Sequence, residues 1–149
     1  FVYGATAFAS GVGEELSPCP QAPRHFVLLA PGVNVPTASV FTAPELTRNT
    51  KPLKIFGLSR GQRVFRGKND LQAVVTSRHA EVAKALALLD QAARAFGIDP
   101  GSCVFLPVPE NRLASAVQHL RESGSGISAL QVRAVRSLPT HPLREWAFA

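Results

Sequence analysis

The chain has 149 residues, the usual size of one domain, and 46% of them are apolar. This share is typical of a globular protein and excludes a disordered tail. No apolar run approaches the roughly 20 residues that a membrane helix needs, so no membrane is expected as a partner. The net charge of +6 favours anionic partners such as nucleotides or phosphorylated metabolites.

The densest basic stretch lies at residues 60–68 and carries four of the Lys and Arg residues. It contains one aromatic residue, Phe65, and no recognised nucleic-acid motif accompanies it. We interpret it as a solvated loop, and nucleic acid is not an expected partner.

The two cysteines, Cys19 and Cys103, are far apart and form no Cys-x-x-Cys pair. Two such cysteines fit a reducing cytoplasm, while a single disulfide between them stays open. The four histidines have no metal-ligand spacing, so no metal site is predicted in this chain.

The chain begins at Phe1 and contains no methionine, which favours a piece of a longer protein. The first 17 residues alternate weakly around Gly11 and Gly13, and this pattern predicts a hairpin or two short strands around a glycine turn. Three prolines at positions 18–23 then break the pattern and indicate a boundary or connector.

The apolar run at residues 25–30 predicts a buried strand, which the dipeptide at Pro31 ends. Thr37 stands where a helix N-cap would, and residues 38–43 then predict a helix of one or two turns. Residues 44–68 are expected to form an extended surface loop with a short strand at 53–56.

Two helices follow this loop. Asn69 and Asp70 are placed to cap a helix that starts near Leu71. The clearest helix covers residues 80–96, with Gly97 as its C-terminal stop. Its predicted apolar stripe consists of Val82, Leu86, Leu89, Ala93 and Phe96.

The last third of the chain continues the alternation of strands and helices. Helices alternating with strands that can pair antiparallel predict an α+β sandwich of ferredoxin-like type. The elements expected here are a buried strand at 102–106 ended by Pro107 and Pro109, a helix at 110–122 and a half-buried or edge strand at 130–136. Residues 143–149 are expected either to add a short final strand or to lie across the surface.

The stretch from Pro31 to Phe41 is the first candidate site. A strand followed by a loop and a capped helix exposes backbone N–H groups at a helix N-terminus, which suits an anion. Phe41 could offer a flat apolar surface to a base. In the alternative interpretation Thr37 only caps the helix and Phe41 belongs to the core.

Two glycine-rich stretches are weaker candidates. Glycines at residues 97–102 permit close approach to a phosphate, but no Lys follows as in a Walker A loop, and a helix C-cap with a turn is the alternative. The Ser-Gly-Ser-Gly at 123–126 follows a helix instead of opening one, so we interpret it as a C-cap and flexible turn.

Five sequence strings occur in a characteristic order. The strings are Ala-Phe-Ala-Ser-Gly-Val-Gly-Glu at 7–14, Pro-Gly-Val-Asn-Val-Pro-Thr at 31–37, Arg-Asn-Thr at 48–50, Asn-Asp-Leu at 69–71 and Gly-Ser-Cys-Val-Phe at 101–105. Together they resemble the GHMP superfamily of small-molecule kinases, and within it the family that phosphorylates 4-diphosphocytidyl-2-C-methyl-D-erythritol. The resemblance covers nearly the whole chain but only the later half of the family's length.

The resemblance implies a domain division. Residues 1–20 would be the end of the N-terminal kinase domain and a connector, including a remnant strand or hairpin. Residues 21–149 would form the GHMP kinase C-terminal domain. The ATP loop and the catalytic Asp of the family lie in the N-terminal half, with the Asp expected just before Phe1, so no catalytic residue is expected in this chain.

The resemblance also implies an activity for the parent protein. It would transfer the γ-phosphate of ATP to the 2-hydroxyl of its substrate, with Mg²⁺, in non-mevalonate isoprenoid biosynthesis in the bacterial cytoplasm. This chain alone would be inactive and would bind neither ATP nor Mg²⁺. Its expected partners are a cytidine-diphosphate substrate and the missing N-terminal half.

Matched to the family's pattern, Thr37 would contact the substrate and Phe41 would stack on the cytosine ring, with Pro36 and Ala38 beside them.

The candidate phosphate loop at Gly97, Gly101 and Ser102 departs from the family's pattern. The family has Ser-Gly-Ser-Gly directly before its strand, whereas here the spacing is longer and a proline removes a backbone N–H donor. The departure counts against a phosphate-facing role. It also keeps open the alternative of a non-catalytic nucleotide- or metabolite-binding module, a diverged pseudoenzyme with the same pocket.

Overall fold

The computed structural model describes residues 4–51, 69–98 and 104–142. These residues form an α+β fold, as expected from the sequence, and the strands expected at 53–56 and 143–149 lie outside them. The elements in chain order are β1 (Ala7–Ser10), β2 (Glu15–Pro18), β3 (His25–Ala30), α1 (Thr37–Phe41), α2 (Asp70–Arg78), α3 (Ala80–Ala95), β4 (Phe105–Val108), a 3₁₀ turn η2 (Glu110–Arg112), α4 (Leu113–Ser123) and β5 (Gln131–Arg136).

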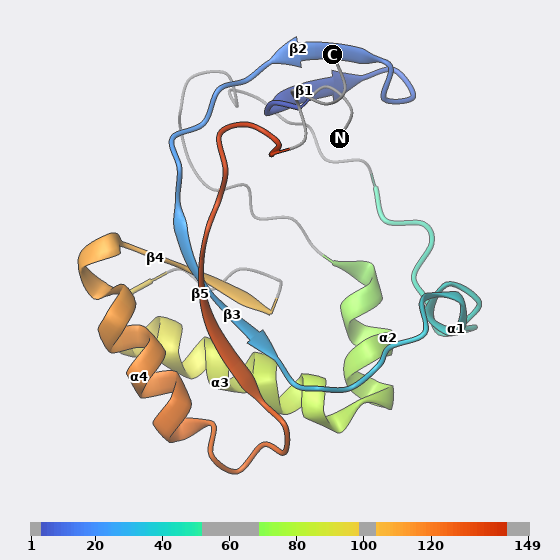
Figure 1. Ribbon diagram of the computed structural model, residues 1–149. Helices are drawn as coiled ribbons and strands as arrows, with labels where there is room; N and C mark the ends of the chain where they lie inside the picture. The colour runs from blue at the N-terminus through green and yellow to red at the C-terminus, as the bar shows by residue number, and fades with distance from the viewer. Residues whose placement is uncertain (1–3, 52–68, 99–103, 143–149) are drawn as a thin grey trace.

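The main sheet has three described strands in the order β4-β3-β5, all antiparallel (Figure 1). Val27 in the central strand pairs with Leu106 on one side and with Ala134 on the other. The apolar run at 25–30 therefore forms the buried central strand that its composition predicts. The alternating strand near the C-terminus lies at an edge of the described sheet, also as predicted.

Helices α3 and α4 cover one face of this sheet and enclose the main core. Val27 and Leu29 point into it from the central strand and are 0% and 1% exposed. Most of the buried surface is aliphatic, so the core is held by the hydrophobic effect and close packing. The other buried members are Ala85, Leu88, Leu89, Ala92, Ala93, Leu106, Val108, Ala116 and Leu120.

The buried face of α3 is wider than the predicted stripe. Ala85, Leu88 and Ala92 are buried as well, whereas Leu86 is only half-buried. The helix contacts α2, α4 and β4, so it buries surface toward several neighbours. A single stripe at helical spacing describes a helix that faces one neighbour only.

Strand β4 continues through Pro107, where the sequence predicted an end. The N–H of Leu29 donates to the carbonyl of Val104 at 2.9 Å, which makes these two residues a hydrogen-bonded pair. Antiparallel pairs alternate, so Pro107 opposite Phe26 is a non-hydrogen-bonded position. At this position the backbone nitrogen of Pro107 points away from β3, and β4 lies at an edge of the described sheet. The N–H that proline lacks is therefore not needed for a hydrogen bond to β3.

Helix ends follow the predicted signals in most places. The side chain of Asn69 accepts a hydrogen bond from the N–H of Leu71 at 3.1 Å and caps α2 as expected. The helix predicted at 110–122 begins with a 3₁₀ turn and continues as α4 to Ser123.

The first two strands form the predicted hairpin, with Phe8 opposite Ser17. Gly11 and Gly13 both have positive φ angles, +66° and +106°, as the turn requires. The hairpin stands apart from the three-stranded sheet (Figure 1). Its side chains are largely exposed, including the apolar side chains of Phe8 and Leu16.

Gly124, at the end of α4, lies where the loop packs tightly against the core. Its φ is an ordinary −88°, so its backbone conformation does not require glycine. A Cβ at this position would lie 2.5 Å from Leu130 Cδ2, 2.7 Å from the carbonyl oxygen of Leu120 and 3.1 Å from Leu88 Cδ2. The predicted C-cap is therefore also a point of close approach.

We expect Gly124→Ala to lower the free energy of unfolding by about 1–3 kcal/mol, because one of the clashing atoms belongs to the helix backbone and cannot move freely. Gly126→Ala is the matched control, since a Cβ there meets no atom within 4 Å. Urea denaturation of both variants measures the difference. Equal effects of the two substitutions would contradict the steric explanation.

Candidate functional site

Helix α1 carries the residues that the sequence singled out. It has five residues, and Val40 is its buried member. Val40 packs with Ala43 and with Val74 of α2 in a second small core. This contact fixes which face of α1 turns inward. Partly buried apolar side chains around it are Val35, Leu46, Leu71 and Val75.

The four predicted substrate-binding residues, Pro36, Thr37, Ala38 and Phe41, are all exposed. Thr37 and Phe41 are four positions apart, so they lie on the same side of the helix, and the buried Val40 beside them turns toward α2. The Phe41 side chain is 56% exposed. The alternative interpretation that places Phe41 in the core is therefore wrong, because Val40 fills that role.

The N-cap of α1 is Pro36, not Thr37 as predicted. Pro36 has an extended backbone with φ −65° and ψ 113°, and Thr37 is already the first helical residue. No side chain caps this end; the Ser39 hydroxyl instead donates to the carbonyl of Pro36 at 2.8 Å. Within the described residues the Thr37 hydroxyl has no hydrogen bond, so it can serve a ligand.

The other end of α1 is held by arginines that the sequence did not identify as site residues. Nη2 of Arg48 donates to the carbonyl of Phe41 at 2.7 Å and to that of Ala43 at 3.3 Å. Helix C-termini leave such carbonyls without partners, and a guanidinium satisfies them well. Arg48 belongs to one of the five strings, but its contacts depend on how the chain turns after α1.

Arg78, the last residue of α2, makes a second set of contacts. Its Nε and Nη2 lie 2.8 Å and 2.6 Å from Oε1 of Glu45, and its Nη1 donates to the carbonyl of Ser39 at 3.1 Å. A backbone hydrogen bond of Glu45 itself, and then the Arg78 guanidinium, hold the pKa of the Glu45 carboxyl below its usual value. No signal in the sequence links these two residues, which are 33 positions apart.

The candidate phosphate loop begins as a helix cap. Gly97 has φ +60°; its N–H donates to the carbonyl of Arg94 at 3.2 Å, and the N–H of Ile98 donates to that of Ala93 at 2.8 Å. This pair of bonds is the Schellman arrangement that closes a helix. The conformation of Gly97 is thus explained by the end of α3. Gly101 and Ser102 lie outside the described residues.

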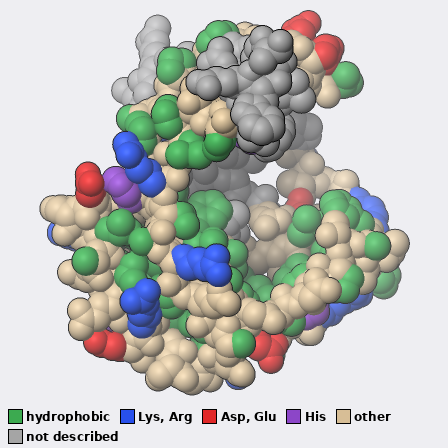
Figure 2. Space-filling model, in the orientation of Figure 1, with side chains coloured by type: hydrophobic (Ala, Val, Ile, Leu, Met, Phe, Trp, Pro, Cys, Tyr) green, Lys and Arg blue, Asp and Glu red, His purple; other side chains and the backbone are tan. Residues whose placement is uncertain are grey.

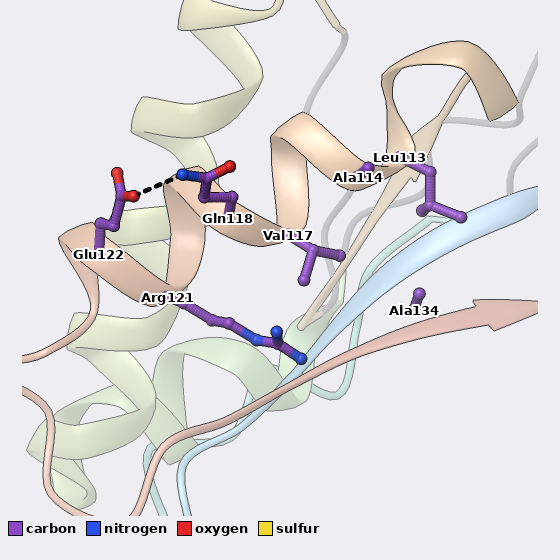
Figure 3. A pocket seen from close by; sticks show the side chains of 7 residues that line it. All are labelled: Leu113, Ala114, Val117, Gln118, Arg121, Glu122 and Ala134. Atoms are coloured by element: carbon purple, nitrogen blue, oxygen red, sulfur yellow. Dashed lines mark hydrogen bonds between the residues drawn. The ribbon is translucent and has the colours of Figure 1, made fainter.

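A groove of about 670 Å³ lies between α4 and β5, away from α1 (Figure 3). Arg121 reaches across it from α4, with Nη2 3.5 Å from the carbonyl of Val132. Gln118 donates to Glu122 on the rim at 2.9 Å. None of the predicted site residues lines this groove. Its lining is Leu113, Ala114, Val117, Gln118, Arg121, Glu122 and Ala134.

The described surface gathers no single basic patch in the view of Figure 2, where Lys and Arg side chains are scattered. The basic stretch at 60–68 lies outside the described residues. Among the residues that the structure does describe, no helix has the length and apolar character to cross a membrane. The same residues contain no group of three or more His, Cys, Asp or Glu side chains that could hold a metal ion.

Comparison with known proteins identifies relatives of this chain, although no family model matches it. The relative from Thiobacillus denitrificans is 43% identical over 147 residues, which cover 98% of this chain and 49% of the relative. A relative from Aromatoleum aromaticum is 40% identical over 98% of the chain and 48% of its own length. One from Paraburkholderia phymatum is 38% identical over 100% of the chain and 50% of its own length.

All three relatives are named as kinases of a small molecule. The chain belongs to the 4-diphosphocytidyl-2-C-methyl-D-erythritol kinase family. It spans about half the length of the curated relatives it matches and corresponds to their C-terminal half.

If Gly97 serves the helix end, Gly97→Ala should lower the free energy of unfolding by about 1 kcal/mol, because alanine is disfavoured at positive φ. Gly97→Asn should cost less, since Asn tolerates this conformation better. Urea denaturation measures both. A Gly97→Ala variant as stable as the wild type would contradict this role of Gly97.

The Glu45 carboxyl should stabilise the fold only while it is ionised. Its pKa is lowered by folding, so its contribution is present above the usual glutamate pKa of about 4.3 and disappears as the pH falls through the lowered value. We expect wild type to be more stable than Glu45→Gln at about pH 7 and the difference to shrink as the pH falls below the usual glutamate pKa of about 4.3. Urea denaturation across this pH range tests this.

Arg78→Ala, which removes the partner, should show a similar pH dependence. Both side chains of the pair are more than a third exposed, so added salt should reduce the difference as well. A difference between wild type and Glu45→Gln that stays constant across the pH range would contradict this account.

Proposed function

We propose that this chain is the substrate-binding C-terminal part of an ATP-dependent kinase, which phosphorylates the 2-hydroxyl of 4-diphosphocytidyl-2-C-methyl-D-erythritol in non-mevalonate isoprenoid (terpenoid) biosynthesis. Membership of the family supports the reaction, because the relatives carry the name of that kinase. The observation that carries the binding role is the exposed Phe41 ring on a helix that Val40 anchors to α2.

The cytosine ring of the substrate stacks on Phe41 in this proposal. A large exposed aromatic side chain leaves apolar surface in water, and a flat base covers it. The Thr37 hydroxyl lies on the same helix face and offers one donor and an acceptor to a polar atom of the ligand. Pro36 and Ala38 border this face and contribute no long side chain that would block it.

The chemistry of phosphoryl transfer belongs to the half that precedes this chain in the proposed full-length protein. ATP supplies the phosphoryl group when bound, and Mg²⁺ neutralises its charge. The catalytic Asp and the nucleotide loop are assigned to that half, so this chain contributes substrate binding and is inactive alone. The bacterial cytoplasm is the proposed location.

The β1–β2 hairpin is assigned to the same preceding half, with residues 1–20 as its end and connector and 21–149 as the C-terminal domain. Among the described strands it shares no ladder with the three-stranded sheet, and an isolated two-stranded hairpin is marginally stable in water. Exposed Phe8 and Leu16 offer it apolar surface for further packing.

We expect Phe41→Ala to weaken the binding of cytidine diphosphate to the full-length protein by about 5- to 150-fold, because base–aromatic stacking contributes about 1–3 kcal/mol. Isothermal titration calorimetry measures the dissociation constant. Phe41→Trp, which keeps an aromatic face, should retain most of the affinity. Leu138→Ala removes another exposed apolar side chain and should leave binding unchanged.

A folded Phe41→Ala variant with wild-type affinity for cytidine diphosphate would contradict the stacking role. Phosphate transfer separates the kinase from the alternative of a diverged binding module. A full-length protein that binds the cytidine compound but never converts it in the presence of ATP and Mg²⁺ would favour the binding module.

A further inference from the structure

Helix α1 is too short to hold its own conformation. It has five residues, whereas isolated helices below about 12–15 residues are marginal in water. No side chain caps its first turn, and its one buried side chain is Val40. The direction in which Phe41 points therefore depends on contacts from outside the helix.

Arg48 supplies the first of these contacts at the carbonyl of Phe41 itself. One guanidinium nitrogen lies 2.7 Å from this carbonyl and 3.3 Å from that of Ala43. Hydrogen bonds from a charged donor are stronger than neutral ones, and a cation suits the C-terminal end of a helix. The peptide plane of Phe41, and with it the Cα–Cβ direction, is held by this bond.

Arg78 supplies the second contact from a different helix. It donates to the carbonyl of Ser39, two residues before Phe41, and the Glu45 carboxylate fixes its guanidinium. Through Arg78 the end of α2 is bound to the backbone of α1 at Ser39 and to Glu45, which follows the helix. Two arginines thus hold α1 by its backbone while its exposed face stays open.

We propose that Arg48 and Arg78 are positioning residues that present the Phe41 ring to the substrate base. This inference rests on the proposed stacking role of Phe41. The arginines act through the backbone of α1, because the atoms they contact are main-chain carbonyls and the Glu45 carboxylate. The Arg78–Glu45 ion pair is exposed, and such pairs add little to global stability. The loss of Arg78 should therefore affect ligand binding more than unfolding.

The test is a double-mutant cycle in the full-length protein, with cytidine diphosphate as the probe and calorimetry as the readout. We expect Arg48→Ala to weaken binding by about 2- to 10-fold in the wild-type background. In the Phe41→Ala background the same substitution should cause no further loss, since there is no ring left to position. In the kinase assay Arg48→Ala should raise KM and leave kcat unchanged.

Arg112→Ala is the matched control. Nη1 of Arg112 donates to the carbonyl of Phe96 at 2.8 Å, at the end of α3. The Arg112→Ala substitution therefore removes a similar contact from a different helix. It should leave the dissociation constant unchanged. Arg48→Lys keeps the charge but presents one ammonium group in place of the planar fork, and its affinity should fall between the wild type and Arg48→Ala.

The outcomes separate the two proposals. Wild-type affinity in Phe41→Ala, or no binding by the wild type, overturns the stacking role itself. Weakened binding in Phe41→Ala with unchanged binding in Arg48→Ala and Arg78→Ala overturns only the positioning role. An equal loss from Arg48→Ala in both backgrounds overturns it too, because Arg48 would then act independently of the ring. If Arg48→Ala fails to fold, the same cycle with Arg48→Lys decides.

Discussion

The burial of Val27 and Leu29 between the sheet and helices α3 and α4 supports the helices of the described chain. Both side chains are almost wholly removed from water, which contributes about 1.5–3 kcal/mol for each. Helix α3 rests on this surface, α2 packs on α3, and α1 packs on α2. The exposed helix of the candidate site is thus the last member of a series of contacts that begins in the central strand. A loss of packing at the core would reach the site through two intervening helices.

Local patterns in the sequence predict most of this architecture because they report which residues repeat on one face. The central strand, α3 and the edge strand β5 follow from their periodicity, and the stops at Gly97 and Gly124 follow from helix-ending chemistry. The continuation of β4 through Pro107 could not be predicted. It depends on the strand lying at an edge and on the pairing register, and both are properties of the sheet as a whole.

The candidate site shows the same division. The sequence leaves open whether Phe41 is exposed or in the core, and the packing of Val40 against Val74 leaves Phe41 exposed. The arginine contacts with the helix backbone are less predictable still. Arg78 and Glu45 are far apart in sequence, and each alone resembles an ordinary surface charge. Family resemblance names residues that contact a ligand, whereas residues that hold those residues in place emerge from the structure.

The antiparallel pairing of β3 also sets the order in which the chain can fold. Val27 pairs with Leu106, which follows α3 in the sequence, and with Ala134, which lies close to the C-terminus. Contacts between such distant segments form slowly, because the loop between them must close first. During synthesis the central strand and α1 leave the ribosome long before β5 does. The central strand is therefore made early but paired late, and until then its two open edges expose an apolar segment that is prone to aggregation.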